Sequence, residues 1–139
     1  MIEVFVEGKP IPQGSLNPMP YRRKNGKMGV NVFQKPELLQ WREKVAKEVA
    51  SHNESKVFYV KETPVLIDLE FRILKPKSAK RKEPCCKGID LDKACRAILD
   101  ALTGVVYDDD CQVCRIRTLK EYVTDEKNQG VYITIDAYP

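Results

Sequence analysis

Six aspartates occupy one short stretch of the sequence. Asp90 and Asp92 are separated by one residue, Asp100 follows, and three consecutive aspartates fill positions 108–110. A cluster of like charges destabilises a compact chain unless a divalent cation, a basic partner or solvation offsets it. Carboxylate oxygens suit hard cations, and magnesium binds through one or two carboxylates together with waters and substrate phosphates. Of these three explanations, a divalent cation is the one that would give the cluster a catalytic role.

The spacing of these acids permits convergence on metal ions. Asp90 and Asp92 can bind one ion if the chain is extended there, and Asp109 or Asp110 can bring a carboxylate from beyond an intervening helix. Two such ions activate a water and stabilise the leaving oxygen of a phosphodiester. Arg96, one turn into the helix, is placed to balance charge on the attacked phosphate.

Simpler interpretations of the same residues remain open. Asp92, Arg96 and Asp100 stand at i, i+4 and i+8, so they can form an intrahelical ladder that stabilises by roughly 0.2–0.5 kcal/mol per pair. The run 108–110 is also typical of a turn, and we interpret Asp108 as a solvated turn residue. The EF-hand pattern fails for lack of its glycine and terminal glutamate.

Other chemistries find little support in the sequence. No Walker-type lysine loop or glycine-rich dinucleotide fingerprint is present, so we expect no nucleotide cofactor. A serine or cysteine hydrolase needs a general base, and the single histidine, His52, falls on a surface-type helix.

Basic residues gather in two segments on either side of the chain's middle. The two groups are Arg22, Arg23, Lys24 and Lys27, and Lys75, Lys77, Lys80, Arg81, Lys82 and Lys87. Either run alone is typical of a solvated loop. Bases around an acidic centre are more informative, and they predict contacts with a nucleic-acid backbone and salt-sensitive binding. The net charge of +4 permits such a partner without requiring it.

Composition indicates one globular domain, residues 1–139, because 42% of the residues are hydrophobic and 32% are charged. The apolar runs are too short for a membrane span, and the N-terminus lacks a signal-peptide pattern. We therefore expect a cytoplasmic protein without membrane association.

The chain has five cysteines, an odd number, and we expect them to be reduced thiols. Their positions lack the paired spacing of a structural zinc site.

Periodicity and turn residues predict the elements that position these side chains. In chain order they are a strand at 2–6, a loop at 9–29, a short strand at 30–33, a helix from 36 to about 52, a strand at 65–73, a basic segment at 75–87, a helix at 91–103 and strands at 111–123 and 131–137. The last two strands are predicted to form a hairpin. This β-β-α-β-α-β-β order indicates a compact α/β (α+β) domain with two main helices on a mixed sheet.

The two predicted helices each have an apolar face. In the helix at 91–103, four residues form a core stripe: Leu91, Cys95, Ile98 and Leu102. Gly104 follows as a natural C-terminal position. In the helix at 36–52, Pro36 suits the first turn, and Trp41 is expected to face the core rather than to stack on a base.

At this point the sequence resembles a known family. The strings IDLDKACRAILDALTG and YDDDCQV are similar to the signature of the RusA-type Holliday junction resolvases, D-x-D-N-L-x-K-x-x-x-D-A-L followed by D-D-x-Q-V. The matching positions are Asp90, Asp92, Asp100, Ala101, Leu102, Asp109, Asp110, Gln112 and Val113. The first third resembles the family loosely, through the opening strand, the PIPQG segment and the following helix.

The resemblance implies a small magnesium-dependent endonuclease that acts as a homodimer on four-way DNA junctions, in recombination and repair, and is often encoded by a prophage. Manganese is expected to substitute for magnesium. It implies metal-binding carboxylates at Asp90, Asp92 and Asp110, with Asp109 or Asp100 in support.

The chain departs from the family pattern at three positions. Arg96 stands where the family has its catalytic lysine, and Lys93 and Ala94 stand where Asn and Leu are expected. Arginine keeps the positive charge but cannot donate a proton, so charge stabilisation survives and proton transfer does not. Lys93 either lowers metal affinity or contacts the phosphate.

These observations lead to a first hypothesis of a structure-selective endonuclease. Its expected catalytic residues are Asp90, Asp92, Asp110 and Arg96, and its expected DNA contacts are Arg22, Arg23, Lys24, Lys80, Arg81, Lys82, Lys93 and Arg96. A second hypothesis is a junction-binding protein of the same fold with impaired catalysis. A third is a small interaction domain that binds zinc through its cysteines.

Overall fold

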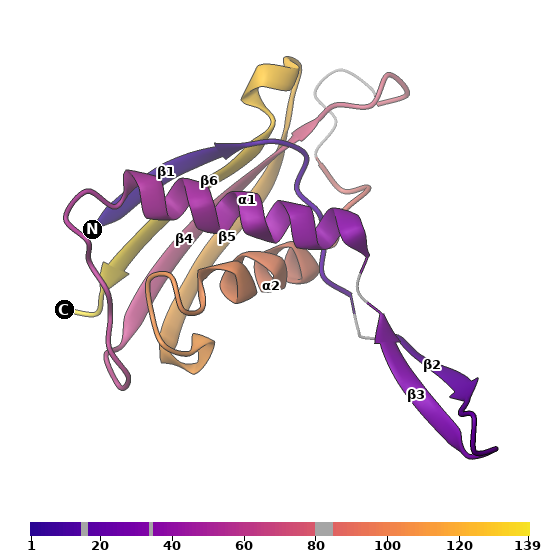
Figure 1. Ribbon diagram of the computed structural model, residues 1–139. Coiled ribbons are helices and arrows are strands. Elements are labelled where there is room, and N and C mark those ends of the chain that lie inside the picture. Colours follow the sequence, from indigo (N-terminus) through magenta and orange to yellow (C-terminus); the bar gives the residue numbers. More distant parts are fainter. Residues whose placement is uncertain (15–16, 34, 80–84) are drawn as a thin grey trace.

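The computed structural model describes residues 1–14, 17–33, 35–79 and 85–139 of the chain. Its elements are β1 (Ile2–Glu7), β2 (Asn17–Arg22), β3 (Met28–Phe33), α1 (Pro36–His52), β4 (Val65–Leu74), α2 (Leu91–Leu102), the 3-10 turn η1 (Asp110–Gln112), β5 (Val113–Val123), the 3-10 turn η2 (Glu126–Asn128) and β6 (Gly130–Ala137). Figure 1 shows the body formed by one sheet and two helices, from which the β2–β3 hairpin extends. The predicted α+β class, with a mixed sheet and two main helices, is confirmed.

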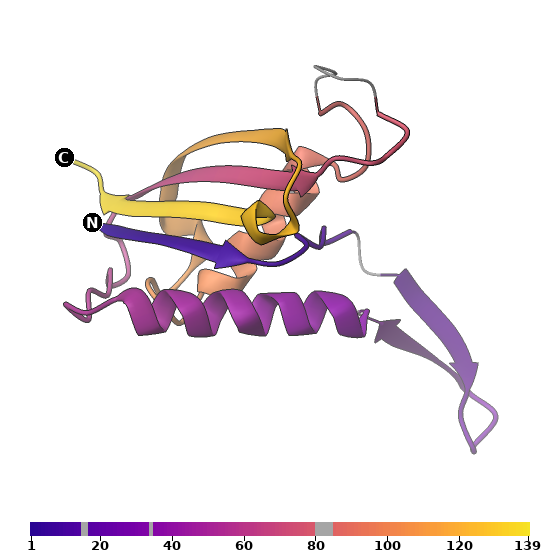
Figure 2. The same ribbon diagram turned by 90° about the horizontal axis from the view of Figure 1, so that it is seen from above.

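The main sheet has the strand order β1-β6-β4-β5. β6 runs antiparallel to both β1 and β4, whereas β4 and β5 are parallel. Parallel neighbours need a crossover connection, and α2 supplies it here. Alternate residues of β4 are buried, as its sequence pattern predicts, and α1 runs along one side of the sheet (Figure 2).

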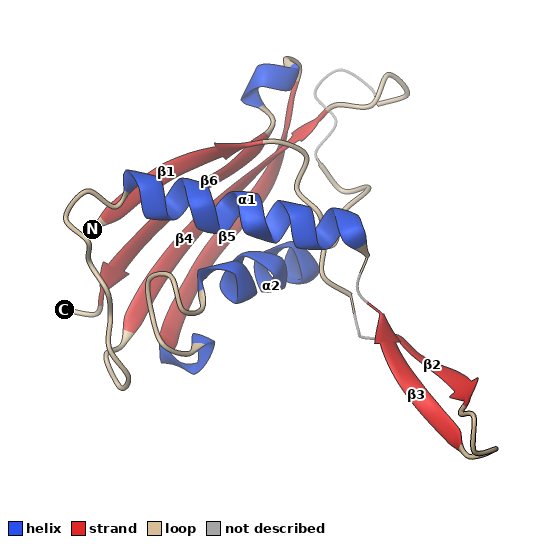
Figure 3. Cartoon of the chain, viewed as in Figure 1, coloured by secondary structure: helices blue, strands red, loops and turns tan. Residues whose placement is uncertain are grey.

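The predicted hairpin between the last two strands is wrong. β6 enters the sheet between β1 and β4, and β5 lies at the edge beside β4 (Figure 3). The burial of the two strands explains this placement. β6 is buried at alternate positions along most of its length, as a central strand should be, while β5 is mostly exposed.

The predicted loop at 9–29 is also only partly right. Asn17–Arg22 forms β2, which pairs antiparallel with β3 and faces Gly29 and Met28 near its end. The strand predicted at 30–33 is confirmed as the second half of β3. β2 contains two prolines, which cannot donate to a sheet ladder, and they are tolerated because a two-stranded ribbon consists of edge strands only.

Both helices contribute to one core. α1 buries Leu38, Trp41, Val45 and Val49, which confirms that Trp41 faces the core. The buried face of α2 consists of small and aliphatic residues: Ala94, Cys95, Ala97, Ile98, Ala101 and Leu102. Small side chains let α2 pack closely against α1 and β5. In the described part of the chain, no helix is long and apolar enough to span a bilayer.

Candidate active site

The acidic residues are organised by the start of α2. Asp90 has extended backbone angles, and its carbonyl accepts the first helical hydrogen bond from Ala94 N at 3.0 Å. Lys120 Nζ of β5 donates to the carbonyl of Ile89 at 2.9 Å, which ties the sheet edge to this helix start. At the other end, Gly104 has φ +79°, a conformation that terminates helices and favours glycine. The expected helix end is therefore confirmed.

Four of the predicted site residues line one surface depression. Asp92, Arg96 and Asp100 come from successive turns of α2, and Asp110 comes from η1. The depression has a volume of about 450 Å³, and two residues of β5, Ile116 and Thr118, also line it. Within the described residues, Arg96 forms no ion pair with Asp92 or Asp100, so the intrahelical ladder is not formed. The guanidinium is left available to a ligand.

Asp110 is the carboxylate whose ionisation its neighbours disturb most clearly. Its pKa is raised, first by partial desolvation, then by the hydrogen bond and charge of Asp109 and by the charge of Asp100. The positive charge of Arg96 acts in the opposite direction. Carboxylates that hinder each other's ionisation favour the presence of a proton or a cation. The depression is therefore electrostatically suited to a cation.

Asp109 has a different role from its neighbour. Its carboxylate accepts the backbone N–H of Cys111 at 2.9 Å, and its own N–H donates to Gln112 Oε1 at 2.9 Å. These contacts form a capping box around η1, and the Cys111 N–H lowers the pKa of Asp109. Asp109 does not line the depression. It shapes the turn that presents Asp110.

Gln112 anchors this turn to the body of the protein. Its side chain is buried, and Nε2 lies within hydrogen-bond distance of three carbonyls, those of Tyr59 (3.0 Å), Val60 (2.9 Å) and Thr63 (3.1 Å). One amide thus holds the segment before β4 against the turn that carries Asp110. The sequence marks Gln112 as part of a motif but does not reveal this role.

Asp90 does not join the other carboxylates. Its side chain is 62% exposed and forms an ion pair with Lys93 Nζ at 3.1 Å. It does not line the depression. The first predicted pair, Asp90 and Asp92, is therefore not brought together on one site in this structure. Lys93, expected either to lower metal affinity or to contact the phosphate, is the partner of Asp90 in this ion pair.

Potential metal ligands were sought throughout the described residues. No group of three or more His, Cys, Asp or Glu side chains there has the arrangement of a formed metal site. The chemistry of the donors nevertheless fits a hard cation, because Asp92, Asp100 and Asp110 surround one depression with carboxylate oxygens. The five cysteines are free, and of these Cys95 lines the depression.

The predicted DNA-contact residues are widely separated. Arg22, Arg23 and Lys24 are exposed where β2 passes into the turn of the hairpin, and none of them lines the depression; the hairpin extends from the body of the protein (Figure 1). Lys80, Arg81 and Lys82 lie outside the described residues. Asp108 is exposed as expected, but it also accepts the backbone N–H of Lys61 at 2.7 Å, so it is more than a solvated turn residue.

Gln13 is a site residue that the sequence did not reveal. It belongs to the PIPQG segment, and its backbone N–H donates to the carbonyl of Lys93 at 3.0 Å. Its side-chain amide donates to Asp100 Oδ2, and only 7% of the residue is exposed. Within the described residues Oε1 has no hydrogen-bond partner. A buried glutamine thus connects the segment after β1 with two positions of α2.

The chain was compared with known proteins. The family model described as endodeoxyribonuclease RusA matches residues 7–136 of the 139-residue chain. A search of curated proteins gave no match. The matched range contains all the carboxylates discussed above and both glutamines that hold them, Gln13 and Gln112.

Proposed function

Because this chain belongs to the RusA endodeoxyribonuclease family, we propose that it cleaves branched DNA, above all four-way junctions, by magnesium-dependent phosphodiester hydrolysis. One observation carries the proposal. Asp92, Asp100 and Asp110 surround a single depression beside the guanidinium of Arg96. Family membership supports the nuclease activity, and the choice of metal is our inference from the donor chemistry.

The residues divide the work according to their chemistry. Asp92 and Asp110, with Asp90 and supporting Asp109 or Asp100, would hold a divalent cation, which supplies an activated water and shields developing negative charge. Manganese should replace magnesium, because carboxylate ligands suit both ions. Arg96 would bind the attacked phosphate and stabilise its charge without donating a proton.

Binding of the junction would rest on Arg96 in the depression and on cations outside it. Arg22, Arg23 and Lys24 are exposed on the hairpin, and Lys93 and Arg96 are exposed on α2. Lys80, Arg81 and Lys82 are assigned to the same role on sequence alone. We further propose a homodimer acting in recombination and repair, because symmetric cleavage of two strands suits two identical sites related by a two-fold axis.

The central test is cleavage of a synthetic four-way junction, a duplex and single-stranded DNA, with and without magnesium. We expect magnesium-dependent cleavage of the junction by the wild-type protein. Asp110→Asn should reduce the cleavage rate by roughly 100-fold or more, because it removes a charged ligand, while junction binding persists. Asp108→Asn is the matched control, since Asp108 belongs to the same turn but bonds to Lys61 N. Equal cleavage by Asp110→Asn would remove that residue from the site.

The Asp90–Lys93 ion pair favours a second candidate, a junction-binding protein with impaired catalysis. If the pair restrains metal binding, Lys93→Asn should lower the magnesium concentration for half-maximal cleavage about 1.5- to 5-fold, because surface ion pairs contribute roughly 0.2–1 kcal/mol. Lys47→Asn, on the exposed face of α1, is the control. Junction binding without any cleavage by the wild-type protein would establish the second candidate.

A further inference from the structure

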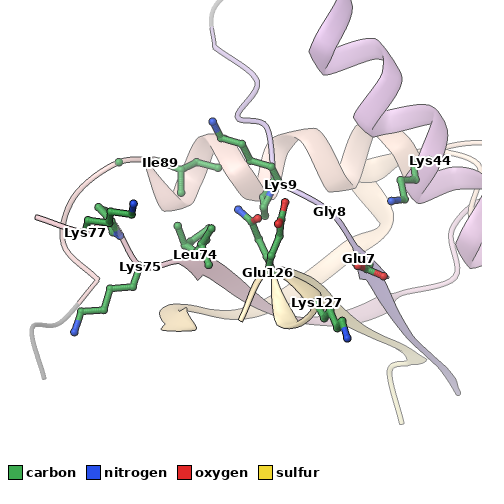
Figure 4. A pocket seen from close by; sticks show the side chains of 15 residues that line it. Glu7, Gly8, Lys9, Lys44, Leu74, Lys75, Lys77, Ile89, Glu126 and Lys127 are labelled. Carbon is green, nitrogen blue, oxygen red and sulfur yellow. The ribbon is translucent and has the colours of Figure 1, made fainter. Parts of the chain in front are cut away.

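A lysine-lined cleft lies at the end of the sheet, separate from the acidic depression. It has a volume of about 820 Å³, and the residues that line it come from the segment after β1, from α1, from the end of β4, from the start of α2 and from η2. Five of them are lysines: Lys9, Lys44, Lys75, Lys77 and Lys127. Figure 4 shows Lys75 and Lys77 on one side of Leu74, with Lys44 and Lys127 on the other side.

The ammonium groups of this cleft are available to a ligand. Within the described part of the chain, none of the five lysines forms an ion pair, although Glu7 and Glu126 also line the cleft. Four lysines are exposed, and Lys75 is half-buried. The ammonium group of Lys44 lies close to Gly8, where an added Cβ would be 3.4 Å from Nζ.

The lining indicates the chemistry of the ligand. Lysines from four separate segments outnumber the two glutamates, so the cleft attracts anions. Flexible ammonium groups without a fixed fork suit repeated phosphates better than one planar carboxylate.

We propose that this cleft binds the phosphodiester backbone of a DNA strand that leaves the acidic depression. The proposal rests on the proposed nuclease function. Ile89 lines the cleft and Asp92 lines the depression, so their α-carbons are at most about 10 Å apart along the chain. One DNA strand carries a phosphate every 3.4 Å or so of helix axis. A strand at the depression therefore reaches the edge of the cleft within about three nucleotides.

The test measures binding of an uncut four-way junction over a range of salt without magnesium. Each lost phosphate contact should reduce the slope of log affinity against log salt by about 0.9. Lys44→Ala/Lys127→Ala should therefore reduce the slope by about 2. The factor by which affinity falls between about 50 and 200 mM salt should then be roughly tenfold smaller for the variant than for the wild-type protein. Cleavage at saturating DNA should be unchanged, because these lysines do not touch the reacting phosphate.

Two variants control for general charge effects. Lys47→Ala removes a lysine one turn along α1 that is paired with Glu43 outside the cleft, and it should leave the slope unchanged. Glu126→Gln removes a negative charge from the cleft and should strengthen binding at low salt. A reduction of the salt slope in Lys47→Ala as large as in Lys44→Ala/Lys127→Ala would overturn the assignment.

The remaining outcomes separate this proposal from the proposed function. Unchanged slope in the double variant, with junction cleavage intact, would reject the cleft as a DNA site and preserve the nuclease. A wild-type protein that neither binds nor cuts DNA would reject both. Binding of poly-glutamate is measured beside binding of the junction: if the double variant loses binding to poly-glutamate but not to DNA, the cleft belongs to an acidic protein segment and the proposal fails.

Discussion

At the scale of single residues, Gln13 has contacts suited to positioning rather than catalysis. It bonds to Asp100 through its side chain and to the Lys93 carbonyl through its backbone, so it fixes one carboxylate relative to the start of α2. We predict that Gln13→Ala raises the magnesium concentration needed for half-maximal cleavage by roughly 10–100-fold, the effect typical of groups that orient metal ligands.

The measurement that separates positioning from stability is a metal titration beside a thermal melt. Gln13→Met preserves length but removes the donor, and should resemble Gln13→Ala in the titration. Once Gln13 is replaced, Asp100→Asn should cost less than it does in the wild-type protein, because the two changes share the Gln13–Asp100 hydrogen bond. Fully additive losses, or a lower Tm with an unchanged metal requirement, would contradict the positioning role.

At the scale of elements, Gln112 joins the turn of η1 to the segment before β4. Gln112→Leu leaves three carbonyls and the N–H of Asp109 without this partner. Since an unsatisfied buried polar group costs roughly 1–3 kcal/mol, we predict a loss of about 2 kcal/mol or more in the free energy of unfolding. Urea denaturation measures it, with Gln40→Leu on the exposed face of α1 as control. A loss below about 0.5 kcal/mol, the usual limit for surface substitutions, would argue against the anchoring role.

The same element scale shows what the sequence could predict. The helices could be predicted because Pro36, Gly104 and regular apolar spacing mark them locally. The strand pairing could not be predicted, because β6 pairs with β1 from the other end of the chain and no local signal specifies that pairing. The alternation of apolar and polar residues in the last two strands indicates which residues are buried, but it does not indicate which strand is the neighbour in the sheet.

The candidate site, too, was predictable where local sequence determines it and unpredictable where distant contacts do. The motif correctly placed Asp92, Arg96 and Asp110 on one surface, since a helix and the turn after it define their positions. The partners of the site's side chains could not be predicted from the motif. Asp90, for example, pairs with Lys93 rather than converging with Asp92. Gln13 meets Asp100 across 87 positions of sequence, a contact that only the tertiary fold creates.

At the scale of the whole molecule, the β2–β3 hairpin is an arm attached to a separately packed body. Its two strands pair with each other and with no other described strand. An isolated two-stranded hairpin is marginally stable in water, so its retention suggests a role in binding rather than in folding. The exposed charges Arg22, Arg23 and Lys24 lie where β2 passes into the turn of the hairpin.

This arrangement predicts that DNA affinity and stability respond differently to changes in the arm. Replacing Arg22, Arg23 and Lys24 by glutamine should leave Tm unchanged, because the three side chains are exposed and the core lies elsewhere. It should reduce the salt slope of junction binding by up to about 3, at roughly 0.9 per lost phosphate contact. The arm contributes no residue to the lining of the cleft, so the losses from this variant and from Lys44→Ala/Lys127→Ala should add if one junction contacts both. A lowered Tm would instead make the arm part of the folding unit, and an unchanged slope would exclude it from the DNA path.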